Sequence, residues 1–410
     1  MEKDNIVEMQ SKRKPKLLIL HRYPPEFELI PLPGLMGFYR QFSKKFSIVH
    51  FSMTRKDPEN KELRKYIKVK TIPIKVDIKS TLNKWITFFL YYLYLPIALL
   101  RIKKEKPDII MCRELLPFLP SFVSLLKIPV IIPLSDWWLS IIFGKNKIGR
   151  KAADLIESSE IRHWNKQGFF LAVHNNPEKE FVIKRGFSKQ RVTIVNLPMY
   201  GGVYSPCNAK LERKKFGFSD KDFVIGLHGI IHKSKGYDQV LEWWAKLVKI
   251  HPNWKILFIG GTMGEGWFKK LISDLKIEKN IIMTGWISDQ VVLNKYLNSA
   301  DCLLATRRNT PDTQGNTPSA FTHNLMTGKP TLTTGLPGVV EVIQPRKNGF
   351  LFKPDSYESF KSELEYIYNN RKKAEVVGKK GMQKVKEYYN ANITVKQYTK
   401  IVKRMLNLSG

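Results

Sequence analysis

Short apolar runs bounded by turn residues recur along this chain, and segments with the apolar spacing of amphipathic helices separate them. In the first half, the runs with strand character are residues 17–20, 47–52, 109–112, 130–134, 169–173 and 192–195. Strands that alternate with helices are typical of βα units, which pair as a parallel sheet. The pattern therefore predicts an α/β fold.

The polar, charged and turn-rich segment 205–222 interrupts this alternation, which resumes behind it. The second array is predicted to have strands at residues 223–227, 255–259, 281–284, 302–305, 330–333 and 349–352. One helix face is predicted from apolar residues at helical spacing, namely Val240, Leu241, Trp244, Leu247 and Val248.

Such a change in composition often marks a domain boundary. We predict an N-terminal domain over residues 1–205 and a second domain over 206–392. The final segment, 393–410, is predicted as a helix that packs back on the first domain.

The charge of the chain leaves several partner classes open. The sequence has 69 Lys and Arg against 36 Asp and Glu, a formal net charge of +33. This attracts anionic lipid headgroups, nucleic acids or phosphorylated substrates, or it reflects only a solvated lysine-rich surface. The three cysteines are too few and too widely spaced for a disulfide framework or a metal cluster. The N-terminus lacks the apolar core of a secretion signal, so we expect a cytoplasmic protein.

Residues 85–100 are apolar almost throughout, but they are fewer than a membrane-spanning helix needs and include Pro96. One interpretation is a helix buried against a sheet. The other is an interfacial anchor, since Lys84, Arg101 and Lys103 flank the stretch. The second interpretation predicts a peripheral protein at the inner face of the cell membrane, with an anionic membrane surface as a partner.

The first candidate ligand-binding segment is residues 223–244, FVIGLHGIIHKSKGYDQVLEWW. Its pattern predicts a strand, a basic turn that contains glycine, and a helix. Gly226 and Gly229 permit a close backbone approach to a ligand, and Lys233 or Lys235 can neutralise a phosphate. Surface turns often have the same composition, so the motif alone is weak.

A second region, residues 303–330, reads as strand, polar loop, helix, glycine turn and strand. Loops at the carboxyl ends of parallel strands bind ligands, and Thr317 and Ser319 can hold phosphate oxygens there. Alternatively, Ser319 only caps the helix. A third region, 333–343 with 348–352, indicates turns and no more.

The order and spacing of the three regions resemble the C-terminal domain of the group 1 glycosyltransferases, the large family with bacterial glycogen synthases and many lipopolysaccharide and capsule sugar transferases. The resemblance covers residues 223–406 and is fainter in the first half, through KPKLLIL and IPVIIPLSD. It implies the GT-B fold, two facing Rossmann-like domains with parallel sheets. The implied partners are a nucleotide-sugar donor in the second domain and a glycan or lipid-linked acceptor in the first, with no metal and no other cofactor.

The resemblance also assigns residues to the donor site. Lys235 matches the family lysine that contacts the donor diphosphate. The other matching positions are Gly229 in the first loop and Thr317, Pro318, Ser319 and Ala320 in the phosphate loop. Trp286 and Ile287 match the positions that hold the nucleotide base, and Glu341 matches the acidic residue after the glycine loop.

Three family residues are absent. Gly315 and His323 stand where the family has two glutamates, and Ile230 stands where it has an arginine. We hypothesise that Arg307 or Arg308 replaces that arginine, because an unpaired diphosphate is costly. His323 is then expected to hydrogen-bond the ribose hydroxyls.

In the first domain, Asp136 follows Ser135, which matches the family position that faces the sugar. It is a candidate base or sugar contact, or merely the cap of a helix that starts at Trp137.

The resulting prediction is a glycosyltransferase that transfers a sugar with retention, in cell-surface polysaccharide or glycolipid synthesis. The mechanism that the resemblance implies is one in which the leaving diphosphate is stabilised electrostatically and can itself take the acceptor proton. Alternatives are a shifted donor preference and an inactive family member that serves as a sugar-nucleotide-binding or partner subunit. A nucleic-acid-binding protein is less well supported, because no zinc spacing, RNP-like strand or basic zipper is present, and we expect no specific nucleic acid partner.

Overall fold

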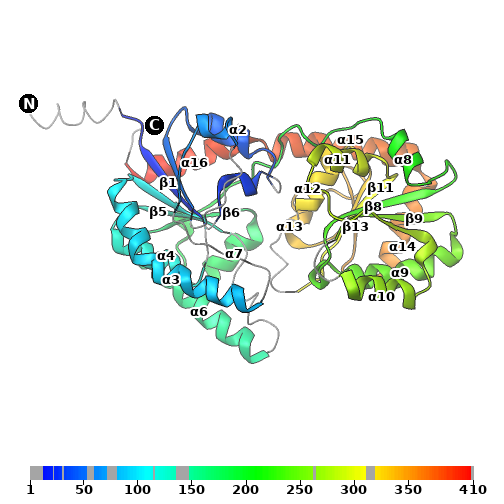
Figure 1. Ribbon diagram of the computed structural model, residues 1–410, viewed down its shortest axis with the longest axis horizontal. Helices are drawn as coiled ribbons and strands as arrows, with labels where there is room; N and C mark the ends of the chain where they lie inside the picture. The colour runs from blue at the N-terminus through cyan, green and yellow to red at the C-terminus, as the bar shows by residue number, and fades with distance from the viewer. Residues whose placement is uncertain are drawn as a thin grey trace, which may run out of the picture. The chain divides into compact units, whose positions relative to one another are not determined.

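The computed structural model describes residues 13–21, 23–29, 32–52, 60–71, 81–113, 116–134, 147–261, 265–310 and 319–407. The chain forms two compact units. Unit 1 is Met1–Pro198 with Ala391–Gly410, and unit 2 is Met199–Asn390. Each unit is a parallel sheet with helices on both faces, as Figure 1 shows, so the predicted α/β fold is confirmed.

Unit 1 has a seven-stranded parallel sheet in the order β3-β2-β1-β4-β5-β6-β7. The strands are β1 Lys16–His21, β2 Ser47–Ser52, β3 Lys68–Thr71, β4 Ile109–Cys112, β5 Val130–Pro133, β6 Phe170–Val173 and β7 Val192–Ile194. The helices are α2 Leu35–Phe42, α3 Thr81–Lys104, α4 Leu119–Val123, α6 Lys147–Lys166, α7 Asn176–Lys184 and α16 Ala391–Met405. The last helix, α16, packs on α2 within this unit.

The apolar stretch of residues 85–100 lies within helix α3, which has a buried and an exposed face from Phe89 onward. Tyr91, Leu95 and Ile102 are buried in the core formed with α4, α6 and the sheet, which confirms a helix packed against a sheet. On the opposite face, side chains such as Phe89 and Leu93 are exposed. No helix in the described parts of the chain is both long and apolar enough to cross a membrane.

Unit 2 has a six-stranded parallel sheet in the order β10-β9-β8-β11-β12-β13. The strands are β8 Phe223–Ile230, β9 Trp254–Gly261, β10 Ile281–Met283, β11 Cys302–Ala305, β12 Thr331–Thr334 and β13 Phe350–Phe352. The helices are α8 Lys210–Lys215, α9 Tyr237–Ile250, α10 Glu265–Asp274, α11 Gln290–Asn298, α12 Ser319–Met326, α13 Pro337–Val340, α14 Tyr357–Asn369 and α15 Arg371–Tyr388.

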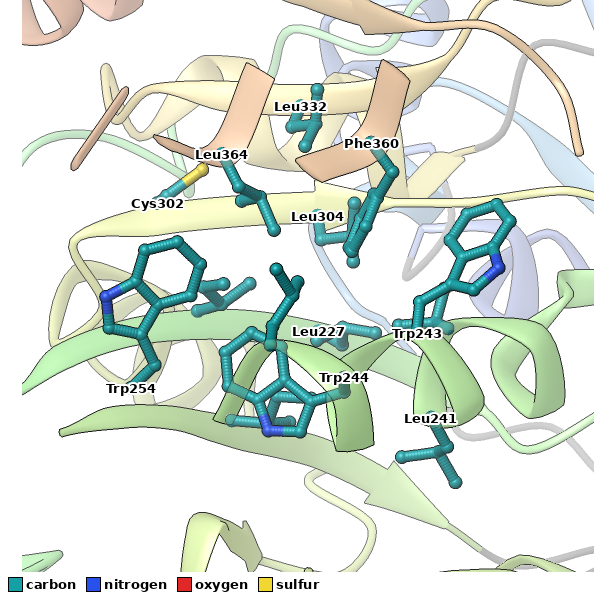
Figure 2. Close-up of a cluster of buried hydrophobic side chains, with 14 of the residues drawn as sticks. Leu227, Leu241, Trp243, Trp244, Trp254, Cys302, Leu304, Leu332, Phe360 and Leu364 are labelled. Atoms are coloured by element: carbon teal, nitrogen blue, oxygen red, sulfur yellow. The ribbon is translucent and has the colours of Figure 1, made fainter. Parts of the chain in front are cut away.

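Aromatic rings fill the core of unit 2. Figure 2 shows Trp243 and Trp244 of α9, Trp254 of β9 and Phe360 of α14 packed around Leu304 of β11. Buried rings of this size remove a large apolar area from water and stabilise the layered fold. Because these rings are buried, they are not available to stack on nucleic acid bases.

Candidate functional site

In unit 2, the carboxyl ends of β8, β9, β11 and β12 lie at one edge of the sheet, because all four strands are parallel. The predicted basic turn, residues 231–236, follows β8 at this edge as a 3-10 turn, Lys233–Lys235. His232 caps the turn, since its Nδ1 accepts a hydrogen bond from the backbone N–H of Ser234 at 3.2 Å. Gly236 then takes a left-handed conformation, φ 70°, and α9 begins.

Gly229 and Gly260 bring two backbones into close approach at this edge. They are register partners on β8 and β9. A Cβ on Gly260 would lie 2.0 Å from the carbonyl oxygen of Gly229, and both residues have positive φ. Nζ of Lys235 lies 3.7 Å from the position of a Cβ on Gly229, so the lysine folds back over the end of β8. Two predicted site residues, Lys235 and Gly229, are therefore adjacent.

Arg308 lies against the same turn. Its backbone N–H donates to the carbonyl of Ser234 at 3.0 Å, and its guanidinium donates to Oδ2 of Asp238 at 2.7 Å. Just before it, the hydroxyl of Thr306 donates to the carbonyl of Lys235 at 2.6 Å. These bonds tie the loop after β11 to the turn after β8, which lie far apart in sequence. Asp238 was not predicted as a site residue, although an acid in the first turn of a helix that follows a basic loop is a recognisable signal.

Arg307 is held between the turn after β8 and strand β12. Its backbone N–H donates to Oγ1 of Thr334 at 3.2 Å. Its Nε is buried and has no hydrogen-bond partner among the residues that the structure describes. A buried N–H without an acceptor costs free energy, so a group that supplies an acceptor here would be favoured. The structure thus places both arginines of the hypothesis beside the Lys235 turn.

His323 lies on α12 and is buried. Its ring stacks on Tyr204 with centroids 4.4 Å apart, and its Nδ1 lies 3.5 Å from Nε2 of His228 on β8. Burial lowers the pKa of His228 well below its usual value, and the charges of His323 and Lys235 lower it further. This pair therefore connects α12 to the strand below the basic turn.

The candidate base-binding residues follow β10. Gly285 forms an isolated β-bridge with Gly260, which brings this loop beside the glycine pair. Trp286 is 48% exposed, and Ile287 is half-buried. An exposed indole at this position offers a flat apolar surface.

The remaining predicted residues are placed in part. Ser319 and Ala320 are half-buried and begin α12, which contacts β11 and β12. Glu341 is exposed directly after α13, and its charge, after burial, contributes to a raised pKa of Tyr388. Asp136, Gly315, Thr317 and Pro318 lie outside the described residues.

Comparisons with solved structures define the fold. HepE from Anabaena, solved with UDP and glucose, has a TM-score of 0.70 and 15% identity over 95% of this chain and 99% of its own. Sucrose-phosphate synthase from Thermosynechococcus elongatus has a TM-score of 0.71 and 14% identity over 97% of this chain and 100% of its own. The fold is therefore that of the GT-B glycosyltransferases, as predicted.

Sequence comparison finds similarity to glycosyltransferases. Residues 208–384 match the model of glycosyl transferases group 1, in agreement with the predicted resemblance. Capsular polysaccharide biosynthesis glycosyltransferase CapM of Staphylococcus aureus is 22% identical over 230 residues, 54% of this chain and 58% of that protein. Putative glycosyltransferase EpsD of Bacillus subtilis is 22% identical over 208 residues, 50% of this chain and 51% of that protein. The chain spans a little over half the length of these two relatives.

Proposed function

We propose that this protein transfers a sugar from a nucleotide diphosphate sugar to a glycan or lipid-linked acceptor, with retention, in the synthesis of a cell-surface polysaccharide or glycolipid. The observation that carries the proposal is the convergence of Lys235, Arg307 and Arg308 at one edge of the unit 2 sheet. The similarity to CapM, a capsular polysaccharide biosynthesis glycosyltransferase, and to HepE, solved with UDP and glucose, supports the proposed pathway and donor.

The proposed chemistry is electrostatic. In the transfer, the bond between the sugar and the diphosphate breaks, and negative charge develops on the leaving diphosphate. Lys235 and Arg307 are proposed to neutralise that charge, so that no metal ion is required. The glycine pair, Gly229 and Gly260, leaves the backbone uncovered where the diphosphate would approach.

A screen of nucleotides and sugar nucleotides as ligands tests this proposal. Thermal unfolding of the full chain would be followed with UDP, GDP, ADP and the corresponding sugar nucleotides, because a ligand that binds the native state raises the midpoint. A rise with at least one nucleotide diphosphate, together with release of that diphosphate from its sugar nucleotide in the presence of membrane lipid or glycan acceptors, is expected. Binding without release would support the inactive subunit instead, and the absence of any binding would refute the proposal.

We further propose that the protein is cytoplasmic and binds an anionic membrane surface through unit 1. Apolar side chains are exposed at helical spacing along α3, at Phe89, Leu93, Ile97 and Leu100, and on the adjacent turn of α4, at Phe118 and Phe122. Helices α3 and α4 lie side by side on one face of the sheet (Figure 1), and the hydroxyl of Tyr92 donates to the carbonyl of Pro117 between them.

Charge at the end of α3 agrees with such a surface. Arg101, Lys103 and Lys104 form its last turn. An apolar face bordered by basic residues is the composition of helices that lie in the headgroup region. We name this combination of α3 and α4 residues the α3–α4 face.

A further inference from the structure

Helix α16 carries its charged side chains on one face. Lys396, Lys400 and Arg404 are exposed and recur at every fourth position, and Lys403 beside them is half-buried. Residues four apart lie on one face of a helix, so the three exposed cations form a row. At 1.5 Å per residue, this row is about 12 Å long. The helix contains no Asp or Glu, so the row is positive along its whole length.

The turn after α2 extends this positive row. Residues 44–45, both lysines, are exposed there, and α2 packs on α16. A Cβ on Gly37 would lie 3.5 Å from that of Ala391, and further along both helices the rings of Phe42 and Tyr398 have centroids 6.2 Å apart. The two helices therefore run in the same direction, and the turn lies toward the C-terminal end of α16. We name the exposed cations of both helices the α2–α16 surface, namely Lys44, Lys45, Lys396, Lys400 and Arg404.

The charge of the α2–α16 surface is not neutralised within the described part of the chain. Glu62, the acid that pairs with α2, is engaged by Arg40 at 3.0 Å. Arg404 donates to the carbonyl oxygen of Gln190 at 3.0 Å, a neutral partner that leaves the positive charge in place. No cation of the surface forms an ion pair with a carboxylate of the described residues. An anionic ligand would therefore meet unpaired positive groups.

The α2–α16 surface and the α3–α4 face lie on opposite sides of the unit 1 sheet. Leu18 of β1 belongs to the core formed with α3, α4 and α6, whereas its neighbour Ile19 lines a cavity together with Phe38 of α2 and Tyr398 of α16. Successive side chains of a strand point to opposite faces of the sheet, and Figure 1 shows the two sets of helices on these two faces. A membrane that contacts the α3–α4 face therefore leaves the α2–α16 surface turned toward water.

The cations of the α2–α16 surface have no apolar or aromatic companions. In the described residues of α2, its turn and α16, no large hydrophobic side chain is exposed, and the rings of Phe38, Phe42 and Tyr398 are buried. A helix in the headgroup region needs an apolar face, and single-stranded nucleic acid stacks its bases on exposed aromatic rings. The surface offers charge alone, which suits a hydrophilic polyanion.

Helix α16 leads away from the carboxyl edge of the sheet. It begins beside the end of β7, where the hydroxyl of Thr394 donates to the carbonyl of Asn196 at 2.7 Å. It ends beside the turn before β7, where Arg404 contacts Gln190. Parallel α/β sheets bind ligands at their carboxyl edge, so an acceptor in unit 1 is expected there. A long acceptor with one end at this edge has the row of cations beside its remaining length.

We infer that the α2–α16 surface binds an anionic glycan chain, the part of the acceptor behind the sugar that receives the new residue. The inference rests on the proposed transferase function and deepens it, because it names the acceptor as an acidic polysaccharide. Lysine ammonium groups pair with carboxylates or phosphates without demanding one geometry. Each exposed ion pair contributes little, so affinity depends on several acid groups that bind at once.

The experiment measures binding of the full chain to labelled oligomers at constant, low ionic strength. The probes are an octamer and a dimer of uronate, an octamer of glycerol phosphate, and maltooctaose as the neutral control. We expect one or both acidic octamers to bind at least tenfold more tightly than maltooctaose and than the dimer, because only an octamer spans the row. The two acidic octamers distinguish a carboxylate glycan from a phosphate one.

Variants locate the binding surface. The double variant Lys396→Gln, Lys400→Gln is expected to bind the acidic octamer about 5- to 20-fold more weakly, the effect of losing two exposed ion pairs. All substituted side chains are exposed, so the midpoint of thermal unfolding should not change. The matched control is Lys372→Gln, Lys379→Gln, which removes the same charge from exposed positions of α15 in unit 2. This control should bind the octamer like the wild type.

Several outcomes would overturn the inference. Equal losses in the two double variants would show attraction to the net charge alone, and equal affinity for maltooctaose would show that acid groups are not recognised. An oligonucleotide of eight phosphates or an anionic vesicle that binds more tightly than both acidic octamers, and loses this advantage in Lys396→Gln, Lys400→Gln, would assign the surface to nucleic acid or membrane. Absence of UDP binding would instead refute the donor site, and the octamer titrations would still test the α2–α16 surface.

Discussion

Nε2 of His228 and Nδ1 of His323 lie 3.5 Å apart in the interior of unit 2, and they join strand β8 to helix α12. The pKa of His228 is lowered, chiefly by burial, so this ring stays neutral in the folded protein at a pH where the unfolded chain already binds a proton. Between the lowered pKa and the ordinary histidine value, the unfolded state binds more protons. Stability must therefore fall as the pH drops below about 6.5.

The first prediction follows from this proton difference. Replacing His228 with Gln should remove a stability loss of about 1.4 kcal/mol per pH unit below pH 6.5. Urea unfolding of the wild type and of His228→Gln at pH 7.5, 6.0 and 5.0 would measure it. The difference between the two proteins should change with pH in favour of the variant toward acid, whereas a constant difference would contradict the assigned state of His228.

Glu160 in unit 1 has the opposite dependence. Burial raises its pKa to about 7, although its carboxylate accepts hydrogen bonds from the N–H of Phe118 and the hydroxyl of Ser121. For an acid with a raised pKa, the folded state holds the proton longer, so stability falls as the pH rises from about 4.5 through 7.

The second prediction is that Glu160→Gln, which is neutral at every pH, gains stability relative to the wild type between pH 5 and 8. The gain should approach about 3 kcal/mol at most, the equivalent of the pKa shift. Thermal unfolding at both pH values would check it. A variant that loses stability equally at pH 5 and pH 8 would show that hydrogen bonding, and not ionisation, dominates at this position.

The third prediction concerns the backbone contact of the candidate donor site. Gly260→Ala would place a Cβ 2.0 Å from the Gly229 carbonyl oxygen at φ 153°, so the strand ends must separate. We expect a loss of about 1–3 kcal/mol in unfolding free energy and weaker nucleotide binding. Gly266→Ala in α10 is the matched control, since a Cβ there meets nothing within 4 Å, and it should be neutral or gain about 0.5–1 kcal/mol. Equal effects of the two substitutions would contradict the steric argument.

The sequence predicted the alternating elements well because buried parallel strands are nearly continuous apolar runs. It missed β3, Lys68–Thr71, because this strand lies at the edge of the sheet and carries lysines at alternate positions. The basic turn and its Lys235 were found because they are contiguous in the chain. The Arg308–Asp238 ion pair was not found, since it forms only when the ends of distant strands meet at one edge.

The fourth prediction tests the cation cluster. Lys235→Gln and Arg307→Gln should each weaken binding of the nucleotide diphosphate by about 10- to 100-fold, because each removes a charged donor. Lys249→Gln, at the exposed end of α9, should leave affinity unchanged. Calorimetric titration measures all three. The same affinity in Lys235→Gln, Arg307→Gln and the wild type would remove the basis for a diphosphate site here.

The fifth prediction concerns the α3–α4 face. Phe89 and Leu93 are 69% and 60% exposed, and transfer of such side chains from water into the headgroup boundary is favourable by roughly 1.5–3 kcal/mol each when complete. The double variant Phe89→Gln, Leu93→Gln should therefore bind anionic vesicles at least tenfold more weakly in cosedimentation. Leu211→Gln is the control, because this leucine is 80% exposed on α8 of unit 2 and lies outside the face.

Lipid composition and salt separate the apolar from the electrostatic part of that binding. Arg101, Lys103 and Lys104 at the end of α3 have little electrostatic attraction to vesicles of neutral lipid. Wild-type binding to such vesicles should therefore fall sharply. In anionic vesicles, added salt should weaken binding through screening, yet the difference between the wild type and the double variant should persist because apolar burial is not screened. If the double variant sediments like the wild type at every salt concentration, the attraction comes from the net charge of +33 alone and α3 does not enter the membrane surface.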